Sequence, residues 1–211
     1  KDKPRVPIGA KLAANLISSA GATRIITIDL HADQIQGFFE VPVDHLFGST
    51  VFVEYIDSLK LKNLTIASPD IGGSKRANAY ARYFNSEIVI CYKKRLTANQ
   101  VHEMKLIGNV KEKDIILVDD MIDTGGTIVK AAKMMKEAGA NSVRAICTHA
   151  VLSGQAHENI EKSVIQELIV SDTLPMKKSN SKIKVLTIAN LFADVIKSIN
   201  NNKSISSQFL I

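Results

Sequence analysis

Residues 116–127 read ILVDDMIDTGGT, and they are the most informative part of the sequence for its fold class. Its apolar start is typical of a buried strand, and Asp119 and Asp120 follow at the carboxyl end. The DTGGT turn then leads into a helical pattern. Ligands of open α/β sheets bind beyond the carboxyl ends of the strands, where glycines, Thr hydroxyls and a helix N-terminus suit a phosphate. The stretch predicts a phosphate site in which the two acids hold sugar hydroxyls or a hydrated Mg²⁺; the alternative is an ordinary strand–turn–helix with an acidic cap.

Short apolar runs alternate with longer helical patterns on both sides of this stretch. The runs predict strands over 24–30, 64–67, 87–92, 114–119, 142–147, 168–170 and 184–187. Helices are predicted over 8–20, 75–84, 127–138 and 188–199, and a surface loop over 177–182. Strand–helix–strand alternation indicates an α/β fold, a parallel sheet flanked by helices.

Composition narrows the class of ligand. The 211 residues are 45% hydrophobic and 23% charged, which is typical of a globular chain, and no apolar run is long enough to span a membrane. The net charge is +6, but with no Trp and 5% aromatic residues the chain lacks aromatic–basic interleaving, so small phosphorylated ligands are favoured over nucleic acid. Cys91 and Cys147 lie far apart in apolar runs, which favours buried thiols and a reducing, cytoplasmic location.

Two further motifs begin at predicted strand ends. In DLHADQ, at 29–34, Asp29 and His31 face the same side of an extended chain and suit a divalent metal, although a histidine here can equally be structural. In SPDIGGSKRA, at 68–77, Asp70 and a Gly-Gly pair precede a helix. This motif predicts a second anion cradle, with a plain strand–helix turn as the alternative.

The string over 116–127 resembles the ribose 5-phosphate loop of phosphoribosyltransferase-like proteins. All three strings in this order resemble the ribose-phosphate pyrophosphokinase family, and the likeness covers the whole chain. Residues 148–149 with 153–154, and 171–173 with Pro175, support it. The resemblance implies a type I phosphoribosyltransferase-like domain over 49–190, part of a second similar domain over 1–48, and a C-terminal helix and tail over 191–211.

The family transfers the β,γ-diphosphoryl group of ATP to the anomeric hydroxyl of ribose 5-phosphate, giving phosphoribosyl pyrophosphate and AMP for nucleotide biosynthesis. By resemblance, the sugar phosphate is held by Asp119, Asp120, Asp123, Thr124, Gly125, Gly126 and Thr127. Mg²⁺ is assigned by resemblance to His31, Asp70, Asp29, Glu40 and Asp44, although Glu40 replaces the aspartate expected there.

Other roles also follow from the resemblance. Lys93 and Arg95 match a catalytic loop that neutralises the transferring group, with a solvated basic loop as the alternative, and Leu96 and Thr97 differ from commoner versions. His31 is expected to act in catalysis and, with Asp2, to contact ATP.

The tail around Ser204 and Ser206 resembles an allosteric site for phosphate or ADP, with a frayed end as the alternative. Family members form hexamers built from dimers. The chain begins inside the ATP-binding segment, so we expect a fragment that binds ribose 5-phosphate with little synthetase activity alone.

Three other functions remain open at this point. A base phosphoribosyltransferase shares the loop over 119–127 but gives no reason for the Asp29 and His31 pair. A non-catalytic regulatory paralogue is disfavoured because the basic string runs into residues 99–101 without an insertion and His31 is present. A nucleic-acid binder is disfavoured because the positive charge is spread along the chain.

Overall fold

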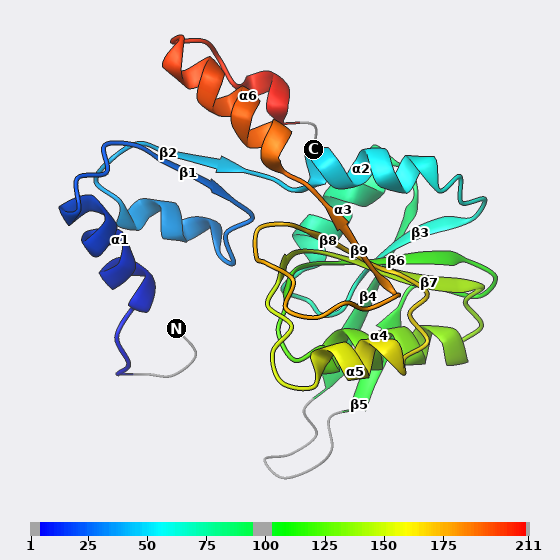
Figure 1. The fold of residues 1–211 in the computed structure, drawn as a ribbon. Coiled ribbons are helices and arrows are strands. Elements are labelled where there is room, and N and C mark those ends of the chain that lie inside the picture. The colour runs from blue at the N-terminus through cyan, green and yellow to red at the C-terminus, as the bar shows by residue number, and fades with distance from the viewer. Residues whose placement is uncertain (1–4, 95–102, 210–211) are drawn as a thin grey trace. The chain divides into compact units, whose positions relative to one another are not determined.

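The computed structural model describes residues 5–94 and 103–209. The chain divides into two compact units, one ending at Phe47 and the other beginning at Gly48 (Figure 1). In the two described ranges, none of the helices combines the length and the apolar character needed to cross a membrane.

The second unit is built on a seven-stranded sheet of order β5-β4-β3-β6-β7-β8-β9. The antiparallel pairing of β5 with β4 is the exception to otherwise parallel pairing. The strands are β3 (Leu64–Ser68), β4 (Glu87–Lys94), β5 (Glu103–Ile107), β6 (Asp114–Ile122), β7 (Ser142–Ala150), β8 (Leu168–Ser171) and β9 (Ile183–Leu186). The predicted parallel sheet is thus confirmed.

Helices cover both faces of this sheet, as Figure 1 shows. Alternate residues of β6 enter different cores: Ile115 and Leu117 pack toward α4 (Gly126–Glu137) and α5 (Ala156–Glu161). Ile116 and Val118 pack toward α2 (Ser49–Ser58) and α3 (Ser74–Tyr83). A strand buried on both faces needs apolar residues at successive positions, which explains the continuous apolar run. The unit ends with α6 (Ala189–Asn200) and the short η2 (Ser206–Gln208).

The chain reverses its direction of travel across the sheet between β3 and β6. From β3 the chain passes through α3 to β4 on one side, and from β6 it passes through α4 to β7 on the other. The loops after β3 and β6 therefore leave neighbouring parallel strands at the same edge. This is the topological switch point at which open α/β sheets bind ligands.

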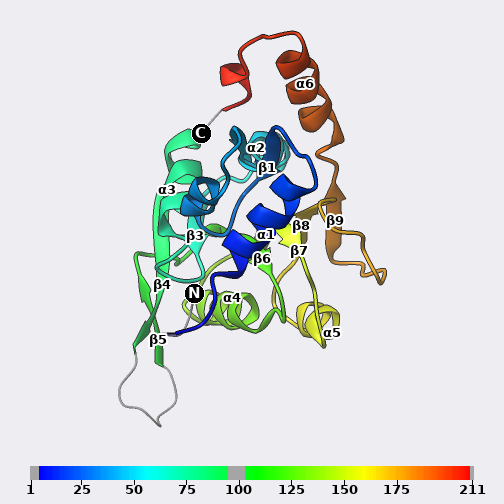
Figure 2. The ribbon, with the colours of Figure 1, turned by 90° about the vertical axis from the view of Figure 1, so that its left-hand side faces the viewer.

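The first unit contains α1 (Gly9–Ser19), β1 (Ile25–Ile28), the 3₁₀-helix η1 (Asp33–Phe38) and β2 (Val43–Leu46). Strands β1 and β2 pair in parallel, from Ile25 opposite Val43 to Ile28 opposite Leu46. Helix α1 contacts η1, and both are drawn in blue in Figure 2. Strand β2, like β5, α2 and α5, was not expected from the sequence. The three domain ranges inferred from the resemblance stay a prediction.

Candidate functional site

The loop between β6 and α4 carries the predicted phosphate site. Strand β6 ends at Ile122, and Gly125 precedes the helix with a φ of 76°, a left-handed conformation that glycine adopts without steric cost. Its carbonyl oxygen accepts the first helical bond, from the Val129 N–H at 3.0 Å. Thr124 and Gly126 are exposed. The first N–H groups of a helix have no acceptor within it, so this turn can present amides to an anion.

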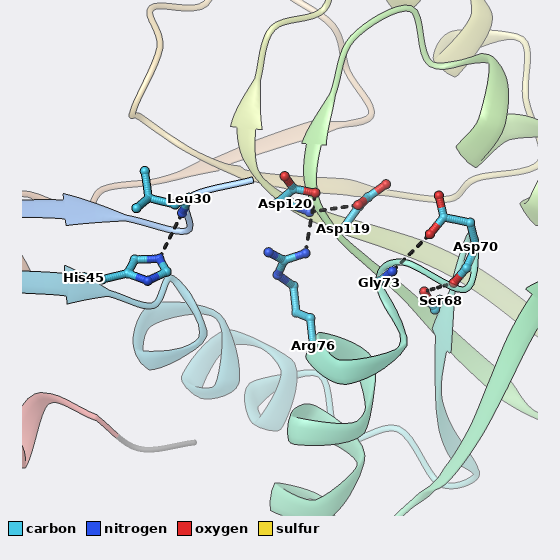
Figure 3. Close-up of polar contacts among 8 residues, drawn as sticks. All are labelled: Leu30, His45, Ser68, Asp70, Gly73, Arg76, Asp119 and Asp120. Carbon is cyan, nitrogen blue, oxygen red and sulfur yellow. Dashed lines mark hydrogen bonds and ion pairs between the residues drawn. The ribbon is translucent and has the colours of Figure 1, made fainter. Parts of the chain in front are cut away.

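Asp119 and Asp120 occupy the end of β6, as predicted. The Asp120 N–H donates to Asp119 Oδ1 at 2.9 Å, and Arg76 Nη1 from α3 lies 3.5 Å from Asp120 Oδ1 (Figure 3). The Asp120 residue is only 6% exposed. The Arg76 guanidinium therefore partly compensates the charge of a buried carboxylate.

The pKa of Asp119 is raised to about 7. Burial is the main cause, because it disfavours the charged form of the carboxyl group. A side-chain hydrogen bond with Asp120 and the negative charges of Asp120 and Asp70 raise the pKa further, whereas the bond from the Asp120 N–H lowers it. The carboxyl group of Asp119 consequently changes protonation near neutral pH, where it can either donate or accept a hydrogen bond.

The loop after β3 is organised around Asp70. Its Oδ1 atom accepts the Gly73 N–H at 3.0 Å, and its carbonyl oxygen accepts the Ser68 hydroxyl at 2.6 Å (Figure 3). The sequence predicted that the Gly-Gly pair would cradle an external anion. The amide of Gly73 instead binds the carboxylate of Asp70, which fixes that carboxylate at the switch point.

The turn after β1 carries two of the predicted metal and ATP residues. Asp29 is buried and has a φ of 40°, and His31 is exposed. The Leu30 N–H donates to His45 Nε2 at 2.9 Å, a contact drawn in Figure 3. The buried imidazole of His45 thereby holds the turn that presents His31. No role for His45 was expected from the sequence.

Two other predicted metal ligands are engaged by basic side chains. Arg24 binds both carboxylate oxygens of Asp44, with its Nε and Nη2 atoms at 2.6 and 3.1 Å. Glu40 Oε1 lies 3.4 Å from Lys11 Nζ and is largely exposed. Across the described ranges, no three His, Cys, Asp or Glu side chains are arranged to hold a metal ion. Asp29, His31, Glu40 and Asp44 therefore do not form a metal cluster within the first unit.

The remaining predicted residues are spread along the chain. Lys93 lies in β4, where it pairs with Met104, whereas Asp2 and Arg95 fall outside the described residues. Ser204 Oγ donates to Ser206 Oγ at 3.0 Å in the tail. The carbonyl oxygen of Gln208 accepts the Thr50 hydroxyl at 2.9 Å, which ties the tail to α2.

Comparison with known proteins identifies the family. The phosphoribosyl synthetase-associated domain matches residues 93–210. Over 210 residues the chain is 55% identical to the ribose-phosphate pyrophosphokinase of Porphyromonas gingivalis, covering 99% of this chain and 67% of that protein. The same enzyme of Campylobacter jejuni is also 55% identical, with 100% and 68% covered.

A solved structure extends the likeness to three dimensions. The crystal structure of phosphoribosylpyrophosphate synthetase from Mycobacterium smegmatis has a TM-score of 0.89 and 38% identity, over 96% of this chain and 67% of that one. The chain thus spans about two thirds of the length of these relatives. On these matches, it belongs to the ribose-phosphate pyrophosphokinase family of enzymes.

Proposed function

We propose that this chain carries the ribose 5-phosphate site of a ribose-phosphate diphosphokinase. The reaction would transfer the β,γ-diphosphoryl group of ATP to the C1 hydroxyl of ribose 5-phosphate, giving phosphoribosyl pyrophosphate and AMP. The observation that carries the proposal is the order of groups at the end of β6. Asp119 and Asp120 lie in the last four residues of β6, and the turn at 123–125 and the start of α4 follow that strand directly.

The phosphate of the sugar would bind at residues 124–127. The amides of the first turn of α4 and the hydroxyls of Thr124 and Thr127 supply donors, and the helix dipole adds partial positive charge. The two carboxyl groups near the end of β6 would then contact the ribose hydroxyls. Asp120 is oriented by Arg76, and Asp119, with a pKa of about 7, can accept or donate a hydrogen bond.

Mg²⁺ is the cofactor that we propose. Carboxylate oxygens are the ligands that this ion prefers. The negative charges of Asp70 and Asp120 contribute to the raised pKa of Asp119, and a cation bound nearby would reduce this repulsion between carboxylates. The bound ion would neutralise charge on the diphosphoryl group. In the second unit the candidate ligand is Asp70. In the first unit, taken by itself, the resemblance points to Asp29 and His31, whereas Asp44 and Glu40 could serve only by giving up Arg24 and Lys11.

The other assignments are also proposals. Lys93 and Arg95 would stabilise the transferring group, and Asp2 with His31 would contact ATP. Ser204 and Ser206 would belong to an allosteric site for phosphate or ADP. We further propose a homo-oligomer, a hexamer built from dimers, in the cytoplasm.

The test is titration calorimetry of this chain with ribose 5-phosphate. Thr127→Val removes one hydroxyl with little change of shape and should weaken binding roughly 3- to 10-fold. Ser58→Ala is the matched control, because the Ser58 hydroxyl donates to the Tyr55 carbonyl within α2 and lies away from the loop.

Product analysis of the complete protein identifies the reaction. AMP formed from ATP and ribose 5-phosphate supports a diphosphokinase, whereas pyrophosphate released in the presence of a base indicates a base phosphoribosyltransferase. A folded chain that does not bind ribose 5-phosphate would refute the proposed site.

A further inference from the structure

The segment after β7 runs directly behind the predicted phosphate loop. The Leu152 N–H donates to the Ile122 carbonyl at 3.0 Å, and the Ser153 N–H donates to the Asp123 carbonyl at 3.0 Å. Strands β6 and β7 pair up to Ile122 opposite Ala150, so these bonds carry the contact past the end of the sheet. The backbone of the loop is therefore hydrogen-bonded to residues 152–153.

Two side chains from the same region complete this contact. Ser153 Oγ donates to the carboxylate of Asp123, and Asn159 Nδ2 of α5 donates to the Thr124 carbonyl at 3.2 Å. A Cβ atom on Gly125 would lie 3.8 Å from backbone atoms of Ala156, so the start of α5 packs next to the turn. Three successive carbonyl groups of the loop, at 122, 123 and 124, thus bond to the segment between β7 and the middle of α5.

Fixing these carbonyl groups also fixes the amides. In a planar trans peptide, the C=O and the N–H of the next residue point in opposite directions. Anchoring the carbonyls of 122–124 on one side therefore directs the N–H groups of 123–125 to the other side. These amides lead into the first turn of α4, where the proposed phosphate would bind.

We propose that Ser153 and Asn159 are positioning residues that hold the ribose 5-phosphate loop in its binding conformation. The inference rests on the proposed function of that loop. Neither side chain is required to touch the sugar phosphate; each acts through Asp123 or Thr124. Without them, the exposed turn gains conformational freedom that binding must remove, so affinity falls while the chemistry is unchanged.

The experiment compares Ser153→Ala and Asn159→Ala with two controls. Ser153→Thr keeps the hydroxyl. Asn141→Ala removes a similar bond, from Asn141 Nδ2 to the Glu112 carbonyl at 2.9 Å, in a turn that precedes β7. Titration calorimetry gives the dissociation constant for ribose 5-phosphate. Hydrogen exchange gives the protection of the amides at 123–127, and steady-state kinetics of the complete protein separates KM from kcat.

Both alanine variants should raise the dissociation constant and the KM for ribose 5-phosphate roughly 3- to 10-fold, with kcat changed less than about twofold. Exchange at 123–127 should quicken in both, and Ser153→Thr and Asn141→Ala should bind like the unmodified chain. If the alanine variants, shown to be folded by their melting temperatures, bind ribose 5-phosphate unchanged, the positioning role is wrong and the proposed function stands. If the unmodified chain does not bind the sugar phosphate, the proposed function itself fails.

Discussion

At Gly73 the loop after β3 has no room for a side chain. An added Cβ atom would lie 2.6 Å from Ser68 Oγ, and that hydroxyl is fully buried and donates to the Asp70 carbonyl. The Gly73 N–H in turn binds Asp70 Oδ1. The orientation of the Asp70 carboxylate thus depends on a glycine that contributes only its backbone.

Gly73→Ala should lower the free energy of unfolding by about 1–3 kcal/mol, because Ser68 must abandon its bond or the loop must shift. Urea denaturation measures the change. Gly9→Ala is the control, since an added Cβ atom there meets no atom within 4 Å, and it should be neutral or slightly stabilising. Equal stability of Gly73→Ala and the unmodified chain would show that Ser68 moves aside freely.

The raised pKa of Asp119 makes stability depend on pH in a definite direction. The folded pKa of about 7 lies above the ordinary 3.8, so the folded chain keeps a proton that the unfolded chain releases in this window. The free energy of unfolding therefore falls as the pH rises from about 4 to 7, and above pH 7 this destabilisation is complete. Asp119→Asn removes the cost and should stabilise the protein at pH 8 by on the order of 2 kcal/mol, with little change at pH 4.

Urea denaturation of the metal-free protein in EDTA, at both pH values, measures this difference. Asp194→Asn, at an exposed position of α6, is the matched control and should show no such dependence. A gain from Asp119→Asn that is equal at pH 4 and pH 8 would contradict the assigned pKa.

Among the elements, the strands with continuous apolar runs were predictable. β6 and β7 were recognised because both of their faces are buried, which requires apolar side chains at most positions of 115–118 and 143–147. β2 and β5 were missed because they are short and carry charged residues, such as Asp44 and Lys105. Helix α2 was missed because it begins at the expected boundary between residues 48 and 49, although Phe52, Val53 and Ile56 have helical spacing.

Part of the candidate site was also predictable from the sequence, and part of it was not. The sequence placed Asp70, Asp119 and the turn at 123–125 at strand ends, because each lies at or within three residues of the end of an apolar run. The sequence did not reveal the pairing of Arg76 with Asp120 or of Ser153 with Asp123, which join residues 44 and 30 positions apart. Such pairs depend on the order of strands in the sheet, and one sequence does not contain that order.

Ile116→Ala in β6 should destabilise the protein by about 2–5 kcal/mol, because the side chain is fully buried against α2 and α3 and its loss leaves a cavity. Chemical denaturation provides the measurement. Ile196→Ala in α6, where the residue is 53% exposed, should cost less than about 1 kcal/mol. Similar costs at the two positions would argue against the two-sided core around β6.

In the molecule as a whole, the two units differ in the size of the hydrophobic core that stabilises them. Both hydrophobic clusters of the second unit draw all their residues from position 52 onward. The first unit has a two-stranded parallel sheet, which is too small to be stable on its own.

A chain of residues 48–211 should therefore fold alone, with dispersed NMR amide signals and one cooperative melting transition. Residues 1–47 alone should give the narrow amide dispersion of an unfolded peptide. A narrow amide dispersion for residues 48–211 would show that the second unit needs the first unit in order to fold.

Parallel strands place the candidate chemistry of the second unit at one edge of its sheet, and this arrangement has a practical use. The turns at the opposite edge, such as the one holding Lys111 and Glu112, contribute no residue to the proposed site. The natural thiols, Cys91 and Cys147, are both fully buried, and burial also raises the pKa of Cys147, so neither is reactive toward a dye. A single Lys111→Cys replacement would accept a maleimide fluorophore or a surface tether without deleting either native cysteine, giving a reporter attached at the edge of the sheet opposite the proposed site.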